Sequence, residues 1–336
     1  MIVRSPKPED NEELIELDRI APEEGLVSYY VDRRPTYIRR PDSENFFPYV
    51  AEEDGRVVGA VFCTLDNLYV NGNHRRCGYI SSLRVHPQYR KKGIGSSLIS
   101  RAIDRGMEEG AEIFWAVVIG KNLASLRTFQ KCGFSRVGGF GFRILTMRRR
   151  KMASGALLRE ATENDLEDMT EIISSFYDKH NFKPEVTEKW LMSRYKIKKR
   201  SLGSFYVAER NEGIVATLRA VRQWYITKMI ITRLSWKVKL ANLFFRLGIR
   251  EGSLLKILDL SDLSYVPGEE MACYDLIDFA KRKYRRECRI AYIQYALGGN
   301  EERFMAKSGG LPGYTDVMAV IPNRRLRKLD PIFPLR

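Results

Sequence analysis

The stretch "VHPQYRKKGIGSSLIS" (residues 85–100) places three cations and two glycines between an apolar strand and an apolar helix. Residues 79–85 are rich in β-branched and apolar side chains, which predicts the strand. Residues 96–110 repeat apolar side chains at helical spacing. A basic, glycine-rich loop at a helix N-terminus is typical of an anion site, because the first N–H groups of a helix have no intrahelical partner. The loop therefore predicts a bound phosphate or pyrophosphate rather than a tight turn with solvated cations.

The composition indicates a folded chain of two domains. It has 336 residues, of which 44% are hydrophobic. The five cysteines are scattered without metal-ligand or redox spacing, and there are only three histidines, so no metal site is expected. No apolar run reaches the roughly 18–20 residues of a membrane helix, and residues 1–17 lack the apolar core of a signal peptide. These features predict a cytoplasmic protein.

The net charge is +15, which attracts polyanions such as nucleic acid, anionic lipid or phosphorylated ligands. A general contribution to solubility is the alternative reading. Because no recognised nucleic-acid module is present, we do not expect a nucleic-acid partner. The sequence leaves the oligomeric state open.

The chain repeats its own pattern after about 150 residues, which indicates a tandem duplication. We expect an N-terminal domain at residues 1–150 and a C-terminal domain at residues 156–336. The fold class predicted for each is α/β (α+β), with a mixed, mostly antiparallel sheet flanked by helices. The matching segments share strand–helix or strand–turn–strand patterns: 1–17 with 156–173, and 47–65 with 204–221.

Two motifs resemble those of one family. "LRVHPQYRKKGIGSSL" (83–98) is similar to motif A of the GNAT (Gcn5-related) N-acetyltransferases, and "NLASLRTFQKCGF" (122–134) is similar to their motif B. A predicted strand, residues 113–119, separates them as in the family. The resemblance covers residues 1–150 well and the second half in outline.

The resemblance implies transfer of an acetyl group from acetyl-CoA to an amine, by direct attack on the thioester. Backbone groups of the strand end would contact the pantetheine arm, and an N–H near Val85 would polarise the thioester carbonyl. The loop would cradle the pyrophosphate, Asn122 would bind the cofactor arm and Phe129 would flank the thioester. The cofactor-binding residues implied are Leu83, Arg84, Val85, Arg90, Lys91, Lys92, Gly93, Ile94, Gly95, Ser96, Asn122 and Phe129.

The sequence departs from the family where a general base and acid are common. Many relatives have Glu at the position of Val117 and Tyr at the position of Phe129. The candidate catalytic replacements are Tyr79 and Ser81, with Ser82 and Asp66 beside them, although each is also an ordinary polar residue of a strand. Cys132 is expected to be a packed thiol.

The second half differs at the matching loop, where Gly268 is followed by Glu269 and Glu270. Carboxylates repel a pyrophosphate, so we expect a degenerate domain that does not bind CoA in the usual way. An apolar, basic helix at 233–249 is expected to pack at the inter-domain seam, cap the acceptor site or contact a membrane surface. Residues 138–143, "GGFGFR", are expected to form a hairpin.

The acceptor is an amine of unknown identity. Residues 22–47 occupy the place where the family covers its acceptor. They combine aromatic and cationic side chains that would suit an acidic or phosphorylated acceptor, and a solvated loop is the alternative. The function expected is N-acyltransfer by the first domain; the alternatives are a CoA-binding sensor without catalysis and a nucleic-acid-associated basic protein. In residues 22–47, the aromatic and cationic side chains that would suit an acidic or phosphorylated acceptor are Tyr29, Tyr30, Arg33, Arg34, Arg39 and Arg40.

Overall fold

The computed structural model describes most of the chain, namely residues 1–32, 45–148, 153–196, 203–211, 213–245, 248–297, 300–307 and 310–320. The elements of the first half are β1 (Ile2–Arg4), α1 (Asn11–Ile20), β2 (Val27–Asp32), β3 (Phe46–Glu53), β4 (Arg56–Val70), β5 (Asn73–Val85), α2 (Ile94–Glu108), β6 (Ile113–Ile119), α3 (Leu123–Lys131) and β7 (Ser135–Thr146).

The second half runs through a similar sequence of elements, with helix α5 in place of strand β2 and with one insertion. Its elements are β8 (Leu157–Glu160), α4 (Leu166–Phe176), α5 (Glu188–Lys196), β9 (Gly203–Arg210), β10 (Gly213–Arg222), α6 (Gln223–Ile226), β11 (Lys228–Leu234), α7 (Trp236–Phe245), β12 (Ile257–Tyr265), α8 (Glu270–Tyr284), β13 (Ile290–Ala296), α9 (Asn300–Lys307) and β14 (Leu311–Val320). The expected α/β fold, with a mostly antiparallel sheet flanked by helices, is confirmed.

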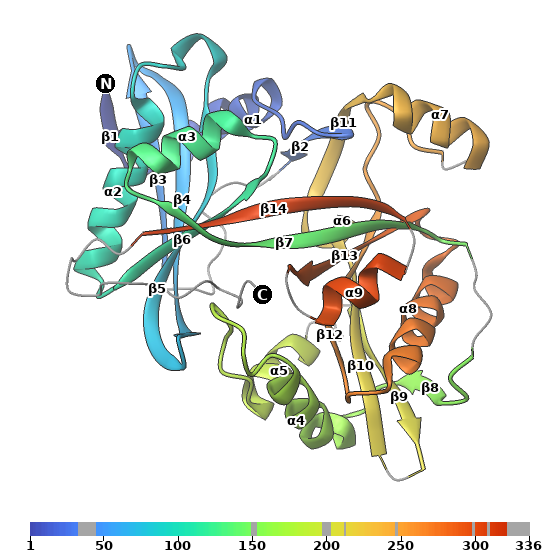
Figure 1. Ribbon diagram of the computed structural model, residues 1–336. Helices are drawn as coiled ribbons and strands as arrows, with labels where there is room; N and C mark the ends of the chain where they lie inside the picture. Colours follow the sequence, from blue (N-terminus) through green and yellow to red (C-terminus); the bar gives the residue numbers. More distant parts are fainter. Residues whose placement is uncertain are drawn as a thin grey trace.

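The two halves share one continuous sheet and exchange their last strands. Among the described residues this sheet has 12 strands, in the order β1-β3-β4-β5-β6-β14-β7-β13-β12-β10-β9-β8. β14 pairs with β6, β7 pairs with β13, and the two exchanged strands pair with each other in the middle, as Figure 1 shows. Each half therefore completes its sheet with a strand from the other half.

A repeated ion triad at the start of each half supports the duplication. In the first half, Arg4 contacts Asp10 at 2.7 Å and Glu52 at 2.6 Å. In the second, Arg159 contacts Asp165 at 2.7 Å and its Nε contacts Glu209 at 2.9 Å. In both halves the aspartate also accepts a backbone N–H at the start of the first helix. The triad thus ties the first strand and the start of the first helix to the neighbouring strand of the sheet, β3 in the first half and β9 in the second.

The triad leads to a prediction about acid stability. The hydrogen bonds from Arg159 lower the pKa of Asp165 to about 2. A carboxyl whose pKa falls on folding stabilises the protein above its unfolded pKa, and this contribution disappears as the pH falls from about 4 towards 2. Asp165→Asn should therefore cost about 1–3 kcal/mol near neutral pH and flatten the acid limb of the stability curve. Urea unfolding across pH 2–7 measures this, with the exposed Asp168→Asn as control; identical acid limbs for wild type and Asp165→Asn would contradict it.

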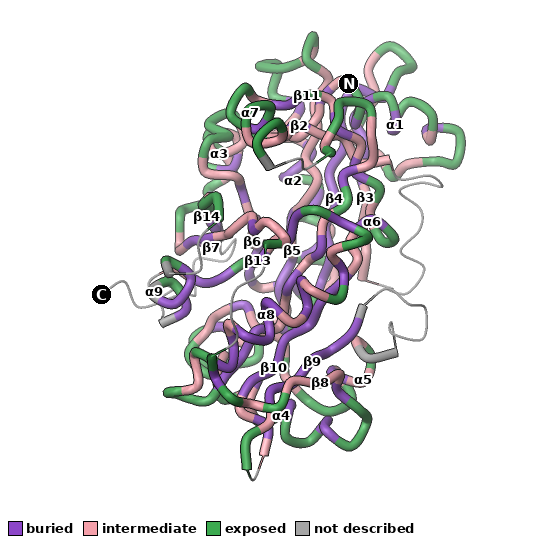
Figure 2. The backbone as a smooth tube through the Cα atoms, turned by 90° about the vertical axis from the view of Figure 1, so that its right-hand side faces the viewer, coloured by how far each residue is buried: buried purple, intermediate pink, exposed green. Residues whose placement is uncertain are grey.

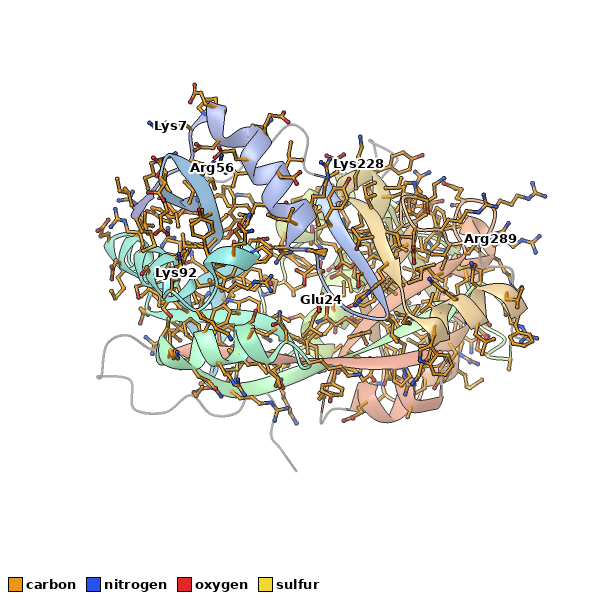
Figure 3. All side chains as sticks on the ribbon, turned by 90° about the horizontal axis from the view of Figure 1, so that it is seen from above. Lys7, Glu24, Arg56, Lys92, Lys228 and Arg289 are labelled. Carbon is orange, nitrogen blue, oxygen red and sulfur yellow. The ribbon has the colours of Figure 1, made fainter. Side chains whose placement is uncertain are left out.

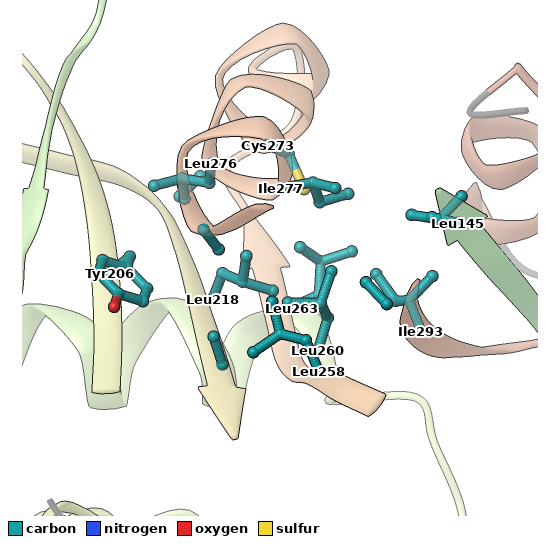
Figure 4. Packing of buried hydrophobic residues seen from close by; sticks show 14 of the residues in the cluster. Leu145, Tyr206, Leu218, Leu258, Leu260, Leu263, Cys273, Leu276, Ile277 and Ile293 are labelled. Atoms are coloured by element: carbon teal, nitrogen blue, oxygen red, sulfur yellow. The ribbon is translucent and has the colours of Figure 1, made fainter. Parts of the chain in front are cut away.

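Each half has its own apolar core against the sheet, and Figure 2 shows the buried residues concentrated on its strands. In the first half, α2 packs through Ile94, Leu98 and Ile99 on the face that carries Phe114. In the second, α8 packs through Leu276 and Ile277 in the same way (Figure 4). Because each long helix is anchored along its length by buried side chains, its N-terminus is held at a fixed place beside the sheet.

The predicted hairpin at 138–143 is wrong, because these residues lie inside the continuous strand β7. Their glycines allow neighbouring side chains to approach the strand closely. A Cβ on Gly141 would lie 2.3 Å from the ring of Tyr295, and one on Gly139 would lie 2.8 Å from the carbonyl of Thr315. The glycines are therefore required by the packing of two strands that lie far away in the sequence.

The insertion of the second half lies between β10 and β12. Its strand β11 pairs with β2 of the first half, and Val238 of α7 packs beneath this ribbon with Met229 and Leu255. The segment expected at the inter-domain seam therefore packs there through Leu234 and Val238, and not through the rest of its apolar side chains. Trp236 and Leu243 are 70% and 74% exposed, so these side chains point away from the protein.

Candidate functional site

Strand β5 changes direction at Ser82, close to the loop. Ser82 has φ +55°, and the register between β4 and β5 shifts between Ala60 and Phe62. A positive φ with one extra residue is a β-bulge, which re-aims the strand beyond it. The bulge therefore sets the direction of Leu83–Val85, the residues expected to contact the pantetheine arm.

The parallel strands β5 and β6 pair over a short distance only. Within the described residues, their ladder joins Cys77–Tyr79 to Ile113–Trp115 and goes no further. Beyond that point β6 continues to Ile119 with β14 on its other edge. The two strands therefore part at Tyr79 and Trp115, and the bulged end of β5 leads directly to the basic loop.

The two glycines of the loop have different tasks. Gly93 is the N-cap of α2 with φ +84°, a conformation that favours glycine, and a Cβ placed there would meet nothing within 4 Å. Gly95 lies where α2 approaches α3, because a Cβ there would be 3.1 Å from Cγ2 of Thr128. Gly93 thus leaves open space above the first turn of α2, whereas Gly95 permits the packing of two helices.

The cations of the loop also have two different roles: two lysines are exposed where they can meet a ligand, and the arginine holds the backbone. Lys91 and Lys92 are exposed beside the first turn of α2, and Lys91 itself has φ +67°. The Nε of Arg90 donates to the carbonyl of Val85 at 3.3 Å, so it fixes the strand end. Positive backbone and side-chain charge therefore gather at the open N-terminus of a helix, the arrangement that binds phosphate groups.

The side chain of Arg84 has a structural role, since it contacts Glu23 at 2.6 Å and Asp18 at 3.5 Å. These acidic partners lie in and after α1, and the sequence analysis did not find them. The contacts leave the prediction for Arg84, which concerns its backbone groups, unchanged.

Helix α3 begins beside the same opening. Asn122 is its N-cap, and the side-chain oxygen of Asn122 accepts from the N–H of Ser125 at 3.1 Å. That oxygen is therefore occupied by the helix, and the amide NH₂ is the part of Asn122 able to donate to a ligand. The role of Asn122 in cofactor binding stays a prediction.

Phe129 is only 4% exposed and packs edge-on against Phe134, with ring centroids 4.9 Å apart. It fills the core and offers no hydroxyl. Burial raises the pKa of the Cys132 thiol, whose Sγ donates to the carbonyl of Ser96 at 3.8 Å. A thiol with a raised pKa is a poor nucleophile, so Cys132 serves packing.

An aromatic stack lies where β5 and β6 part. The ring of Tyr79 contacts Trp115 at 4.5 Å between centroids, and Trp115 contacts Phe182 at 5.0 Å. Ser81 continues β5 on the face of Tyr79, and Val117 continues β6 on the face of Trp115. The structure thus places the two candidate catalytic residues on one strand beside this stack, and their roles stay predictions.

Phe182 comes from the second half and was missed by the sequence analysis. The N–H of Phe182 donates to the carbonyl of Tyr69 at 2.8 Å, and the N–H of Tyr69 donates to Lys183 at 2.8 Å. These bonds attach the segment after α4 to the end of β4. Nothing local in "KHNFKPE" predicts such a contact, because it depends on how the halves assemble.

The matching place in the second half is built differently. Asp262 has φ +51° and marks a bulge in β12 like that of Ser82 in β5. Just after this bulge, the carbonyl of Leu263 accepts a hydrogen bond from the hydroxyl of Tyr177, which also belongs to the second half, at 2.9 Å. The connection to the following helix is also shorter, with residues 266–269 in place of 86–93.

The charges at this second place are acidic. Glu269 is the residue before α8 and pairs with Arg210 at 3.2 Å, and Glu270 begins the helix. The buried Glu301 accepts the N–H of Ala296 at 3.2 Å. The second half thus keeps the bulge, but side chains of the same half, Tyr177 and Glu301, form hydrogen bonds to the backbone groups around it.

Comparison with known proteins agrees with this geometry. The model of the "Acetyltransferase (GNAT) family" matches residues 11–134, which include the bulge, the loop and α3. Residues 11–134 are therefore similar in sequence to the GNAT acetyltransferases. An uncharacterized N-acetyltransferase of Methanocaldococcus jannaschii is 28% identical over 33% of this chain and 50% of its own length. An N-alpha-acetyltransferase of Sulfurisphaera tokodaii is 29% identical over 40% of this chain and 80% of its own length.

The chain spans about half the length of the first curated relatives that it matches, 50% and 44%. Solved structures resemble almost the whole chain in fold. A GCN5-related N-acetyltransferase from Sphaerobacter thermophilus has a TM-score of 0.63 at 15% identity and covers 95% of both chains. The N-myristoyltransferase of Saccharomyces cerevisiae, solved with bound myristoyl-CoA, has a TM-score of 0.62 at 11% identity over 95% of this chain and 78% of its own. At these identities the likeness concerns the fold.

Several sequence predictions concern features outside this site. The cations Arg33, Arg34, Arg39 and Arg40 lie outside the described residues, while Tyr29 and Tyr30 lie on β2. In the part that is described, no three His, Cys, Asp or Glu side chains gather in a way that would hold a metal ion. Across the same residues, no helix combines the length and apolar content needed to cross a bilayer.

Proposed function

We propose that residues 1–150 form an acetyl-CoA-dependent N-acetyltransferase domain and that residues 156–336 form a GNAT-like domain without a CoA site. The observation that carries the proposal is the open, basic N-terminus of α2 directly after the bulged end of β5. Lys91 and Lys92 would hold the pyrophosphate together with the first N–H groups of α2, and Gly93 leaves the space that it needs.

In the proposed reaction the acceptor nitrogen attacks the thioester carbonyl carbon. A C–N bond forms, the C–S bond breaks, and the proton lost by the nitrogen ends on the sulfur or in water. A backbone N–H at the end of β5 would stabilise the charge on the carbonyl oxygen. Tyr79 and Ser81 are the polar side chains we propose beside the reacting atoms.

We propose an α-amine as the acceptor. Deprotonating a lysine near neutral pH costs roughly 4–5 kcal/mol, whereas an α-amine costs only about 1–1.5 kcal/mol. Val117 and Phe129 supply no base and no acid, so an acceptor of low pKa suits this site. The name of the Sulfurisphaera tokodaii relative, an N-alpha-acetyltransferase, agrees with that choice.

The decisive experiment incubates the full chain and acetyl-CoA with a panel of peptides and small amines, and measures the release of CoA thiol. We expect turnover with α-amines and little with lysine side chains. Tight binding of CoA with no turnover on any amine would favour a CoA-binding sensor, for which Val117 and Phe129 are the motivation. Binding of RNA or DNA with a steep salt dependence would favour the basic, nucleic-acid-associated alternative.

The missing base leads to a prediction about pH. If the reaction depends on the unprotonated amine, the rate at subsaturating acceptor should rise about tenfold per pH unit up to the pKa of the amine. The breakpoint should then move when the amine is changed. A breakpoint that stays fixed near about pH 6–7 across amines would show that a protein base exists.

A further inference from the structure

Helix α7 lies in an insertion that the first half lacks. In the first half, β4 turns directly into β5 through Asn71 and Gly72. In the second half, residues 223–256 stand at the same place between β10 and β12 and carry α6, β11 and α7. Figure 1 shows α7 at the periphery, away from the loop before α2. Its surface therefore does not belong to the proposed catalytic site.

One face of α7 is apolar and open to water. Trp236, Leu243 and Phe244 are 70%, 74% and 72% exposed, and Leu240 is 47% exposed. At about 100° per residue these four side chains lie on one side of the helix, opposite the buried Val238. An exposed apolar face of this kind usually marks a contact surface.

The exposed face is held in place by the rest of the insertion. The side-chain NH₂ of Asn242 donates to the carbonyl of Ile249 at 2.9 Å, and the side-chain oxygen of Asn242 accepts from the N–H of Ile249 at 3.1 Å. The carboxylate of Glu251 accepts the N–H of Leu234 at 2.9 Å just before the helix. The helix is thus fixed at both ends with its apolar face outward.

Two lysines of α7 flank this face. Lys237 and Lys239 flank it on either side of the helix, with Nζ of Lys237 5.7 Å from the ring centre of Trp236 and Lys239 paired with Glu251 at 3.3 Å. Figure 3 shows Lys228, on the adjoining β11, far from Lys92 of the loop. Residues 225–250 contain no acidic residue, and their cations are Lys228, Arg233, Lys237, Lys239, Arg246 and Arg250.

We propose that α7 docks this GNAT protein on an anionic lipid surface. The aromatic and aliphatic side chains would enter the boundary between headgroups and acyl chains, while the flanking cations contact lipid phosphates. A second copy of the chain is the poorer occupant, because it would bring two cationic faces of a protein with net charge +15 together. Nucleic acid would match the cations but not Leu240 and Leu243.

The test is co-flotation of the full chain with vesicles of phosphatidylcholine containing about 30% phosphatidylserine, compared with phosphatidylcholine alone. We expect binding to the anionic vesicles that weakens as salt rises. The double variant Leu243→Glu/Phe244→Glu should lower binding about tenfold or more, and Lys237→Glu should lower it by less. Leu157→Glu, at an exposed apolar residue of β8 on the far edge strand of the sheet, away from α7 (Figure 1), should leave binding unchanged.

Trp236 offers a second readout. Its fluorescence should shift to the blue on binding anionic vesicles, and this shift should be missing in Trp236→Phe. Unchanged circular dichroism and CoA affinity in the double variant would show that the fold is intact. Equal flotation of the wild type and the double variant would overturn the proposal, as would a wild type that ignores anionic vesicles. Self-association abolished by the double variant, without vesicle binding, would assign the face to a second copy and also overturn it.

Discussion

Gly93→Asp should lower the affinity of the full chain for CoA about tenfold or more in isothermal titration calorimetry, and the wild type should bind about one CoA per chain. The new carboxylate would stand at the N-cap of α2, where a Cβ meets open space and where the pyrophosphate is proposed to sit. Each lost charge-assisted hydrogen bond is worth about 1.5–3 kcal/mol, and repulsion between like charges adds to the loss.

Two matched variants separate this effect from backbone strain. Gly55 has φ +72° and Gly268 has φ +94°, and a Cβ at either position meets nothing within 4 Å, as at Gly93. Gly55→Asp tests the same chemical change in the turn between β3 and β4. Gly268→Asp tests it before α8, where no CoA is expected. Wild-type affinity in a folded Gly93→Asp would contradict the loop assignment, and an equal loss in Gly268→Asp would contradict the claim that the second half is degenerate.

Val317→Asp, near the end of the described chain, should destabilise the first half as strongly as the second. Val317 is 0% exposed on β14 and pairs with Val117 of β6 and Gly138 of β7. Burying an unpaired charge there should cost about 3–5 kcal/mol. CoA binding should weaken or disappear as well, because β6 loses the neighbour that holds it in the sheet.

Urea unfolding and calorimetry of the full chain measure this effect. The control is Leu311→Asp on the same strand, where the side chain is 47% exposed and the change should stay within about 0.5 kcal/mol. If Val317→Asp kept both the wild-type midpoint and CoA affinity, the strand exchange would not support the first half. Because of the exchange, tests of CoA binding belong on the full chain and not on separated halves.

The sequence predicted those parts of the site that depend on neighbours along the chain. The strand before residue 85, the glycine loop and α2 are encoded locally, and the structure places all three as expected. The repeat was also visible, because both halves need the same alternation of strands and helices. Motifs A and B were recognised in the sequence because each is a short, continuous stretch, residues 83–98 and 122–134.

The exchange of β7 and β14 could not be predicted, because both strands have similar apolar patterns and either could pair with β6 or β13. The hairpin wrongly expected at 138–143 has the same origin. Its glycines resembled a turn, yet they make room for Tyr295 and for the backbone of Thr315. Phe182, Asp18 and Glu23 were missed because their contacts join residues that are distant in the chain.

The strand exchange also sets an order on biosynthesis. The first half has emerged with its loop, α2 and β6 long before residues 311–320 are translated, and until then the edge of β6 lacks its partner β14. During the same interval β7 also lacks its partner β13. One edge of β6 and one edge of β7 therefore remain unpaired while the second half is being translated. Open edges invite wrong pairing and aggregation. We therefore expect the sheet behind the proposed CoA site to close only after the second half has been made, so that folding benefits from rapid completion of the chain or from chaperones that cover these edges.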